Sequence, residues 1–598
     1  MPTLRTLLSS ADGRYAFTEL PAVSPAPASA ADDRTVVLDP SRTFQPLLGF
    51  GSVWTDTDVY NLLRMPPEVQ HDVLVALFDP VKGAGWNFMR LPFGSTDWES
   101  TCDYYTYDDM PYGEKDWALE RFSVERDIRR GLFDLARRCL DINPDLVFLG
   151  SVWGVPAWMK ENDSILYGRF NPACTEVYAR YLRMAVEAYE REGIHLYAVT
   201  PQNESLTGDD RATPACRFTW RMQKDVVIAL RREFESHGIT TQIWVYDHNF
   251  DMARAFVEPM LADPEARAAL DAVAFHDYGG SPAEMGRLAA MHPDVPFYMT
   301  ERLVASPGEI ATVALEFRNG ARSYLQWTTI ANEFGGPHQY MGRCHNVPAV
   351  RTATEPPAEL RNPICCLMDH PERWTRTRGY YLYGQITKYL RRGMVRIDST
   401  EGDRRWVTSA AFRDPATGFL ACLLVNQTDE PQRLRLRCAG FEAPVELPAQ
   451  SVATCLWDGV EGAPFAVADA PAPAFPHEPA YDLEPQEILF GGELRAGEEI
   501  LLSCRVKNVG DAPTADRASL SVRFSLDGDC HIARAIACIP SLAPGEEITV
   551  SANVPFQNKR TWTAEAGWHT FFAFAELGNC PAERNMDNNR MGTERFFA

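Results

Sequence analysis

Short apolar runs alternate with longer amphipathic stretches between residues 86 and 329, and this order constrains the fold more than any other feature. The strand-like runs are WNFMRLPF (86–93), LVFLGSVW (146–153), LYAVTPQ (196–202), TQIWVYDH (241–248), AVAFHDY (272–278), PFYMTE (296–301) and SYLQWTT (323–329). The helix-like stretches cover 124–140, 175–193 and 220–238. Strands that alternate with helices predict βαβ units and a parallel sheet. About eight such units fit a (β/α)8 barrel better than an open sheet, and its active site is expected at the carboxyl ends of the strands.

Two stretches rich in proline and alanine interrupt these patterns. Residues 21–33 predict an extended lead-in, and residues 461–486 predict a semi-rigid linker. After residue 400 the apolar runs are short, alternating and separated by turn residues, which predicts an antiparallel β-sandwich. Residues 487–598 repeat this style, so we predict a second, separate β-sandwich.

Charge and hydropathy exclude several classes of partner. The 598 residues carry a net charge of −23, and such a field repels the phosphates of nucleic acid and of anionic membranes. No window approaches the roughly 18 consecutive apolar residues of a membrane span. The N-terminal residues lack the pattern of a signal peptide, which predicts a cytoplasmic enzyme; export by another route stays an alternative. The sequence indicates no oligomeric state.

The 14 cysteines show no recurring CxxC spacing. Cys365 and Cys366 are adjacent, which does not suggest a metal clamp. We therefore expect most cysteines to be small buried side chains in a reducing compartment, and we expect no zinc site.

The ends of the strand-like runs carry a set of polar and aromatic side chains. Two of them are glutamates, Glu204 and Glu301, which a closed barrel brings face to face. Glycoside hydrolysis needs two carboxyl groups across a sugar ring: one protonates the leaving oxygen, and the other attacks or stabilises the anomeric carbon. The rest of the set is Arg90, Asp97, Trp153, Trp158, Asn203, Asp247, His248, Asn249, His276, Tyr278 and Trp327.

Other residues of this set have side chains that could contact a sugar. The aromatic residues could form an apolar platform for a pyranose face, and Asn203 could hydrogen-bond the 2-hydroxyl. Each residue alone has a more ordinary explanation, such as a solvated loop glutamate, a core tryptophan or a structural histidine. Because all of them fall at predicted strand ends, the joint pattern favours a carbohydrate-active barrel.

At these residues the sequence resembles glycoside hydrolase family 30, which includes lysosomal glucosylceramidase. The resemblance covers roughly residues 40–460 and rests on motifs in the family's order: LLGFGSVWTDT (47–57), FMRLPFGSTDW (88–98), SVWGVPAWMK (151–160), AVTPQNES (198–205), AFHDYGG (274–280), MTER (299–302), LQWTTIANEFGGPHQ (325–339) and YYLYGQITKYLRRGMVRI (380–397). It implies a (β/α)8 catalytic barrel at 49–390 with a side antiparallel β-sandwich. The sandwich would combine one strand from 35–48 with residues 391–462, after an N-terminal lead-in (1–34) and before a linker (463–486).

The resemblance also implies a retaining mechanism, with Glu204 as general acid/base and Glu301 as nucleophile. Asn203 would hold the 2-hydroxyl of the sugar, and Arg90 would pair with the nucleophile and keep it ionised. No cofactor or metal is implied. The other residues expected at the substrate are Asp97, Trp158 and Trp327, which would line the −1 subsite, and His276 and Tyr278, which would lie near the nucleophile. Asp277, between the last two, would be an acceptor for a sugar hydroxyl.

Three positions depart from the family pattern. Ser205 follows the acid/base where many members have proline, which changes the stiffness of the loop but not the acid. Asp277 stands where many relatives have tryptophan, so the family's sugar specificity need not transfer. Arg302 and Leu303 follow the nucleophile in place of small residues, which could change the local field.

The resemblance favours an exo-acting β-glucosidase of the glucosylceramidase type that acts on glucosides with apolar aglycones. The alternatives are an exo β-xylosidase, β-fucosidase or β-galactosidase, an endo-acting enzyme on β-1,6-glucan or xylan, and a non-catalytic glycan-binding or adhesion protein. The presence of both glutamates argues against the last. Residues 487–598 resemble a CARDB-type bacterial sandwich module through VKNVGDAPTADRASLSVRFSLDG and ERNMDNNR. We expect this module to pack or to act as a spacer rather than to bind glycans.

Overall fold

The computed structural model describes residues 3–30, 34–101, 103–207, 213–337, 361–400, 406–458, 480–514, 519–527, 530–539, 541–554, 559–577, 583 and 588–598. The chain divides into two compact units. The first comprises residues 1–247, 263–275 and 285–477, and the second comprises residues 248–262, 276–284 and 478–598. Most of the predicted linker (463–479 of 463–486) lies outside the described residues, as do residues 338–339, 515–518, 528 and 584–587 of three quoted motifs.

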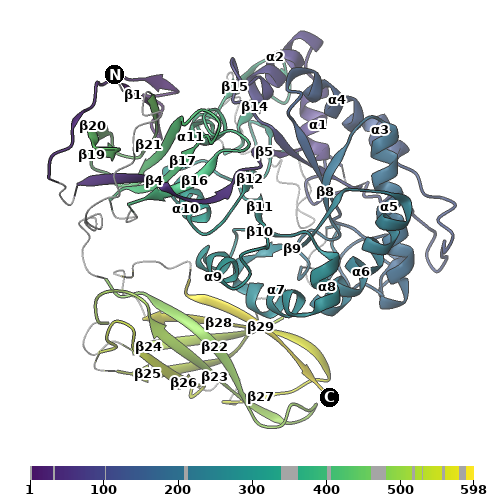
Figure 1. The fold of residues 1–598 in the computed structure, drawn as a ribbon. Coiled ribbons are helices and arrows are strands. Elements are labelled where there is room, and N and C mark those ends of the chain that lie inside the picture. Colours follow the sequence, from purple (N-terminus) through teal and green to yellow (C-terminus); the bar gives the residue numbers. More distant parts are fainter. Residues whose placement is uncertain are drawn as a thin grey trace. The chain divides into compact units, whose positions relative to one another are not determined.

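Eight strands form one parallel sheet in the order β11-β10-β9-β8-β7-β6-β5-β12. Strand β12 pairs in parallel with β5, and two isolated parallel bridges, Phe297–Ala321 and Arg302–Gln326, connect the edges of β11 and β12. The predicted (β/α)8 barrel is therefore confirmed (Figure 1). Its strands are β5 (Gly49–Val53), β6 (Phe88–Pro92), β7 (Val147–Ser151), β8 (Leu196–Thr200), β9 (Gln242–Asn249), β10 (Ala272–His276), β11 (Phe297–Glu301) and β12 (Ser323–Leu325).

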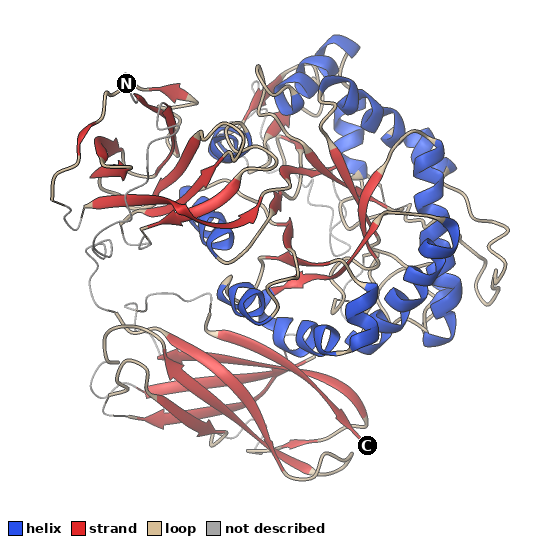
Figure 2. Ribbon diagram, in the orientation of Figure 1, coloured by secondary structure: helices blue, strands red, loops and turns tan. Residues whose placement is uncertain are grey.

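Helices on the outside of the barrel strands complete the βαβ pattern (Figure 2). The stretches predicted at 175–193 and 220–238 are α5 (Thr175–Arg191) and α6 (Trp220–His237). Helix α6 begins after Thr219, whose hydroxyl accepts the N–H of Met222, and it ends at Gly238, whose φ is 66°. The stretch 124–140, predicted as one helix, forms two, because Gly131 has a φ of 89° and interrupts it.

The remaining elements of the barrel region connect these units. Its other helices are α1 (Asp56–Leu63), α2 (Pro67–Phe78), α3 (Glu125–Arg130), α4 (Leu132–Ile142), α8 (Pro264–Ala269), α9 (Ala283–Met291), α10 (Pro307–Arg318) and α11 (Arg378–Thr387), with the short 3-10 turns η1 (Ala157–Met159) and η2 (Pro172–Cys174). A small sheet contains β13 (Ile330–Asn332), β14 (Ile364–Cys366) and β15 (Trp374–Arg376).

Apolar side chains from the barrel strands form one buried cluster. Trp244 stacks on Tyr298 with ring centroids 3.9 Å apart, and Phe88 meets Trp244 edge to face. The other buried members are Leu48, Leu149, Ala198, Ala272, Ala274 and Leu325. Burial of each large apolar side chain contributes about 1.5–3 kcal/mol. This packing fixes the strands from which the polar side chains at their carboxyl ends project.

The predicted side β-sandwich is a ten-stranded sheet that curls around one core, in the order β2-β1-β21-β18-β17-β16-β4-β19-β20-β3. Residues predicted as a lead-in contribute to it: β1 pairs with β21 along its whole length, because Leu4 and Leu8 are buried in this core. The strands are β1 (Thr3–Ser10), β2 (Thr18–Glu19), β3 (Ala26–Pro27), β4 (Thr35–Pro46), β16 (Val395–Ser399), β17 (Thr408–Arg413), β18 (Leu420–Asn426), β19 (Gln432–Cys438), β20 (Phe441–Leu447) and β21 (Ser451–Asp458).

The second unit contains the C-terminal sandwich and two segments of the barrel sequence. One sheet has the order β22-β23-β26, with β27 paired to β23, and the other has the order β25-β24-β28-β29. The two segments contain η3 (Phe250–Met252) with α7 (Ala253–Ala262), and residues 276–284. The strands are β22 (Leu483–Gly491), β23 (Glu499–Asn508), β24 (Ser519–Leu526), β25 (Cys530–Cys538), β26 (Glu547–Ser551), β27 (Trp562–Thr563), β28 (Gly567–Leu577) and β29 (Arg590–Phe597).

The predicted environment of the cysteines agrees with the described part of the chain. Ten free cysteines are described, of which nine are buried and Cys538 is exposed. Among the described helices, none combines the length and the apolar character needed to cross a bilayer.

Candidate active site

The two predicted catalytic glutamates lie close together. Glu301 is the last residue of β11, and Glu204 follows β8 by four residues. A carboxylate oxygen of Glu204 lies within 4.8 Å of one of Glu301. Each residue is 6% exposed, so both carboxyl groups are largely removed from bulk water. The barrel thus brings together residues that are 97 positions apart in the sequence.

Arg90, within β6, connects the nucleophile candidate to the rest of the site. Its Nη1 donates to Oε2 of Glu301 over 2.5 Å, and its Nη2 donates to Oδ1 of Asn203 over 2.7 Å. Nη2 also donates to the carboxylate of Asp247 over 2.6 Å and to the hydroxyl of Ser151 over 2.9 Å. Because Arg90 is fully buried, these charges interact with little screening. The expected pairing of Arg90 with Glu301 is therefore present.

Asp247 lies at a strand end that the sequence predicted, but no role was predicted for this residue. Its Oδ2 accepts hydrogen bonds from Arg90 and from the hydroxyl of Thr200 over 2.7 Å, and its Oδ1 accepts from the hydroxyl of Thr300 over 2.7 Å. Its backbone oxygen accepts the N–H of Glu204 over 2.8 Å. Asp247 thus holds the guanidinium group and the backbone of Glu204 together.

A narrow pocket opens beside Glu204. It is lined by Asp97, Trp153, Asn203, Glu204, Thr207, Thr213, Pro214 and Ala215. The structure therefore brings Asp97 and Asn203, two predicted substrate-binding residues, to the acid/base candidate. The hydroxyl of Thr207 donates to Oε2 of Glu204 over 3.3 Å. Thr207 was not predicted, and only its position three residues after Glu204 could have indicated it.

Aromatic side chains cluster around Trp153, which lines the pocket beside Glu204. Trp153 and Trp327 stack with ring centroids 5.4 Å apart, and Trp98 meets Trp327 edge to face at 6.3 Å. The guanidinium carbon of Arg90 lies 4.3 Å from the ring centroid of Trp153. Stacked indoles present a flat apolar surface of the kind that pyranose rings contact. Trp327 is therefore joined to the Arg90 network through Trp153.

Trp158 is buried, and its indole N–H is engaged within the protein. Its Nε1 donates to Oδ2 of Asp108 over 2.9 Å, and its ring packs edge to face on Trp117. Burial raises the pKa of Asp108 to about 7, against the opposing effect of the Trp158 hydrogen bond. Asp108 was not predicted from the sequence. The hydrogen bond to Asp108 therefore fixes the orientation of the Trp158 indole ring.

The three predicted residues after Phe275 belong to the second unit. His276 ends β10 and is fully buried, whereas Tyr278 is 41% exposed. Their rings lie 6.2 Å apart, and the backbone N–H of Tyr278 donates to Oδ1 of Asn249 over 3.0 Å. Asp277, between them, is half-buried. The exposed ring of Tyr278 and the buried ring of His276 thus occupy different environments.

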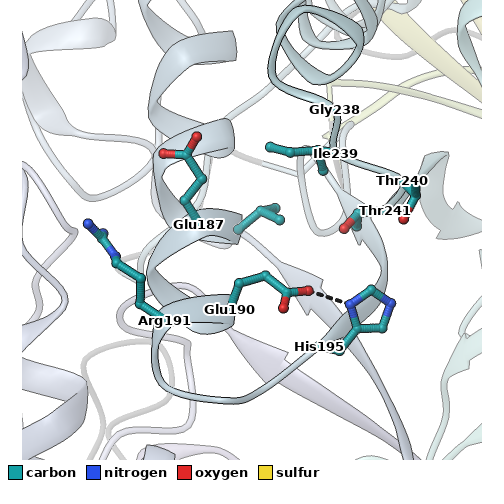
Figure 3. A pocket seen from close by; sticks show the side chains of 9 residues that line it. Glu187, Glu190, Arg191, His195, Gly238, Ile239, Thr240 and Thr241 are labelled. Carbon is teal, nitrogen blue, oxygen red and sulfur yellow. Dashed lines mark hydrogen bonds and ion pairs between the residues drawn. The ribbon is translucent and has the colours of Figure 1, made fainter.

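Another cavity, of about 440 Å³, lies on the outer surface of the barrel (Figure 3). Residues from the ends of α5 and α6 and from the segments that lead into β8 and β9 line it: Val186, Glu187, Glu190, Arg191, His195, Gly238, Ile239, Thr240 and Thr241. Glu190 and Nδ1 of His195 are joined by a hydrogen bond on its edge. None of the predicted site residues lines this cavity.

Residues 47–325 match the family model described as the glycosyl hydrolase family 30 TIM-barrel domain. These residues form a family 30 glycoside hydrolase domain. The family 30 domain includes all ten predicted site residues except Trp327, which lies two residues beyond the matched range. Residues 480–593 match the CARDB family model, which begins seven residues before the predicted boundary at 487.

Curated relatives of the family 30 domain fall into two named groups. The endo-1,6-β-D-glucanase of Neurospora crassa is 27% identical over 449 residues, which cover 70% of this chain and 87% of the relative. The lysosomal acid glucosylceramidase of Mus musculus is 24% identical over 454 residues, which cover 71% and 82%. The putative glucosylceramidase 2 of Caenorhabditis elegans is 25% identical over 330 residues, which cover 51% of this chain and 63% of that relative.

Solved structures share the fold. The endo-β1,6-glucanase BT3312 superposes with a TM-score of 0.65 at 23% identity and covers 76% of this chain and 99% of its own. SrfJ from Salmonella typhimurium gives a TM-score of 0.67 at 22% identity with the same coverage. At these identities the likeness concerns the fold, so the chemistry must be argued from the side chains described above.

Proposed function

We propose that the family 30 domain is a retaining β-glycosidase in which Glu301 is the nucleophile and Glu204 is the general acid/base. The observation that carries this proposal is the short separation of the two carboxylates, within 4.8 Å between their nearest oxygens. Carboxyl groups about 5–5.5 Å apart suit a retaining double displacement, whereas inverting enzymes separate them by about 6.5–9.5 Å to admit a water molecule.

The two steps use the same pair of carboxyl groups. An oxygen of Glu301 attacks the anomeric carbon while Glu204 gives its proton to the departing glycosidic oxygen, so that a glycosyl ester forms and the aglycone leaves. A water molecule then gives its proton to Glu204 and attacks the same carbon, which releases Glu301 as a carboxylate. Arg90 supports the first step, because its hydrogen bond to Oε2 favours the ionised form of Glu301.

A β-linked glucose unit is the sugar that we propose for the −1 subsite. The two groups of relatives are named as glucosylceramidases and endo-1,6-β-D-glucanases, and both names refer to a glucose unit. The stacked Trp153 and Trp327 supply a flat apolar surface, and Asn203 lies beside Glu204, where it can meet the 2-hydroxyl. The sugar ring would thus be held between an aromatic face and a polar edge.

We propose cleavage from the chain end, on glucosides with apolar aglycones, and keep endo-1,6-β-glucanase activity as a second candidate of equal weight. The specific observation for the second is the Neurospora crassa relative, whose match extends over 70% of this chain. Exo β-xylosidase, β-fucosidase and β-galactosidase activity, endo-xylanase activity and non-catalytic glycan binding remain outcomes that the experiment separates.

The experiment compares the wild type with Glu301→Gln on two classes of substrate. The first class is a panel of p-nitrophenyl β-D-glycosides (glucoside, xyloside, galactoside, fucoside and glucuronide), and the second is a linear β-1,6-glucan and a xylan. We expect the glucoside to be hydrolysed fastest within the panel, with initial formation of the β-anomer, and the activity to disappear in Glu301→Gln.

Each result leads to a different conclusion. Turnover of the polymer with release of oligosaccharides, without turnover of the small glucoside, would support the endo-glucanase. Turnover of another glycoside would reassign the sugar but retain the mechanism. Activity that survives in Glu301→Gln, or an initial α-anomer, would contradict the assignment of Glu301 as the nucleophile.

A further inference from the structure

Ser205, the residue after the proposed acid/base, is fully buried and hydrogen-bonds in two directions. Its hydroxyl donates to the backbone oxygen of Tyr246 over 2.8 Å and accepts from Nε2 of Gln223 over 2.7 Å. The other end of the same amide, Oε1 of Gln223, accepts the backbone N–H of Tyr246 over 2.8 Å. The three residues form a closed ring of hydrogen bonds, which joins the loop after β8, helix α6 and strand β9.

This ring holds a part of β9 that the pairing with β8 does not reach. The backbone register between β8 and β9 runs from Ala198–Gln242 to Val199–Ile243. Beyond it, Tyr246 and Asp247 have φ values of 76° and 53°, in the left-handed region. A residue other than glycine in such a conformation costs about 1–3 kcal/mol and persists where its surroundings fix it. Ser205 and Gln223 supply that fixation for Tyr246.

The adjacent residue, Asp247, connects the ring to both catalytic candidates. Its backbone oxygen accepts the N–H of Glu204, which itself has a φ of 48°. Its carboxylate binds Nη2 of Arg90, whose Nη1 binds Glu301. A shift of the peptide at Tyr246 would therefore move the backbone support of Glu204 with respect to the nucleophile.

We propose that Ser205 and Gln223 are a positioning pair that sets the place of the Glu204 carboxyl group relative to Glu301. This inference rests on the proposed function, because it concerns the acid/base step. Gln223 acts through Tyr246 and Asp247, Ser205 also acts through its own peptide bond to Glu204, and neither side chain lines the pocket beside Glu204.

The test uses the dependence of rate on the leaving group. A misplaced acid slows the departure of poor leaving groups, whereas a 2,4-dinitrophenolate leaves without a proton. In Ser205→Ala and in Gln223→Met, we expect kcat/KM for a methyl β-glycoside to fall about 10- to 100-fold. For the 2,4-dinitrophenyl β-glycoside, we expect a fall of less than about threefold. The double variant should lose little more than either single variant, because the two side chains act as one unit.

A matched control separates this effect from a loss of stability. Gln70, in α2, is a buried glutamine whose Nε2 donates to the backbone oxygen of Met65 over 2.8 Å and whose Oε1 accepts from Arg138 over 2.9 Å. Gln70→Met removes a comparable buried amide that contacts no site residue. It should lower the melting temperature and leave the ratio of the two rates unchanged. Active sites in each preparation are counted by trapping with a 2-deoxy-2-fluoro-glucosyl fluoride.

Two outcomes would overturn the inference. One is an equal loss on both leaving groups in Ser205→Ala and Gln223→Met, and the other is no loss on either. The failure of the proposed function looks different, because Glu204→Ala would then show no dependence on the leaving group in the first place. If Glu204→Ala shows that dependence and the two positioning variants do not, only the positioning role is wrong.

Discussion

Nη1 of Arg90 lies 2.5 Å from Oε2 of Glu301, and both side chains are buried. The same guanidinium group is 2.6 Å from the carboxylate of Asp247. One guanidinium group thus binds two buried carboxyl groups at once. In the proposed mechanism, this arrangement holds the carboxyl group of Glu301 next to the carbon at which positive charge develops in an oxocarbenium-like transition state.

Removal of the Arg90 charge should damage both folding and catalysis. In Arg90→Met, two buried carboxylates lose their common partner, and the free energy of unfolding should fall by about 3–5 kcal/mol. In Arg90→Lys, the charge remains but cannot reach Glu301, Asn203 and Asp247 together, so we expect kcat to fall about 100-fold with a smaller loss of stability. Urea denaturation and initial rates measure the two effects. Near-normal kcat in Arg90→Lys would contradict this role.

Loss of the acid/base should depend on the aglycone. In Glu204→Ala, hydrolysis of substrates with poor leaving groups should fall by about 100- to 10,000-fold, because no group protonates the departing oxygen. A 2,4-dinitrophenyl glycoside should still form the glycosyl ester, and azide should accelerate its breakdown with a β-glycosyl azide as product. NMR of that product measures the stereochemistry. An equal loss on good and poor leaving groups would contradict the assignment of Glu204.

The barrel could be predicted from the sequence because each strand is a short apolar run that ends in polar residues. That pattern also identified Glu204 and Glu301, since the carboxyl ends of parallel strands meet at one face. The break of the predicted helix 124–140 at Gly131 was missed, because the apolar period continues across it. The strand Thr3–Ser10 was also missed, since its partner β21 lies more than 440 residues away.

Hydrogen-bonded support of the site could not be predicted in the same way. The sequence placed Asp247 at a strand end but could not show which cation its carboxylate binds, because Arg90 is 157 residues away. Gln223 has the spacing of the buried face of α6, with Val226 and Leu230, but the sequence does not show that its amide binds the backbone of Tyr246. The engagement of Trp158 by Asp108 likewise depends on the path of the loop after β6.

Asp108 should make stability depend on pH. Burial raises the pKa of Asp108 from 3.8 to about 7. Between these two pH values the carboxyl group is protonated in the folded state and ionised in the unfolded state. The free energy of unfolding should therefore fall as the pH rises from about 4 to about 7 and level off above that range. Asp108→Asn removes this titration, and its profile should be flatter. Urea denaturation at several pH values measures it.

The control for this prediction is Asp141→Asn, which changes the same charge at an exposed position of α4. Its profile should follow that of the wild type. A slope that is equal in Asp108→Asn and in the wild type would show that Asp108 does not hold the proton.

The C-terminal sandwich should stabilise the barrel-sequence segments of its own unit. Nε of Arg590, in β29, lies 3.0 Å from Oδ2 of Asp251, and its guanidinium carbon lies 4.1 Å from the centroid of Phe572. The side chain of Asp251 is 3% exposed, so Arg590→Met removes a partner from a buried carboxylate and should cost about 1–3 kcal/mol. Hydrogen exchange of residues 248–262 and 276–284 should become faster.

Arg505→Met provides the matched control, because Arg505 pairs with Glu487 and both side chains are more than 40% exposed. This variant should change the free energy of unfolding by less than about 1 kcal/mol. Removal of residues 480–598 should have a larger effect than either substitution. Met252 and Phe256 are buried in the intact chain and belong to the second unit, most of which this truncation removes. Unchanged exchange of both segments in Arg590→Met and in the truncated chain would show that the sandwich does not support them.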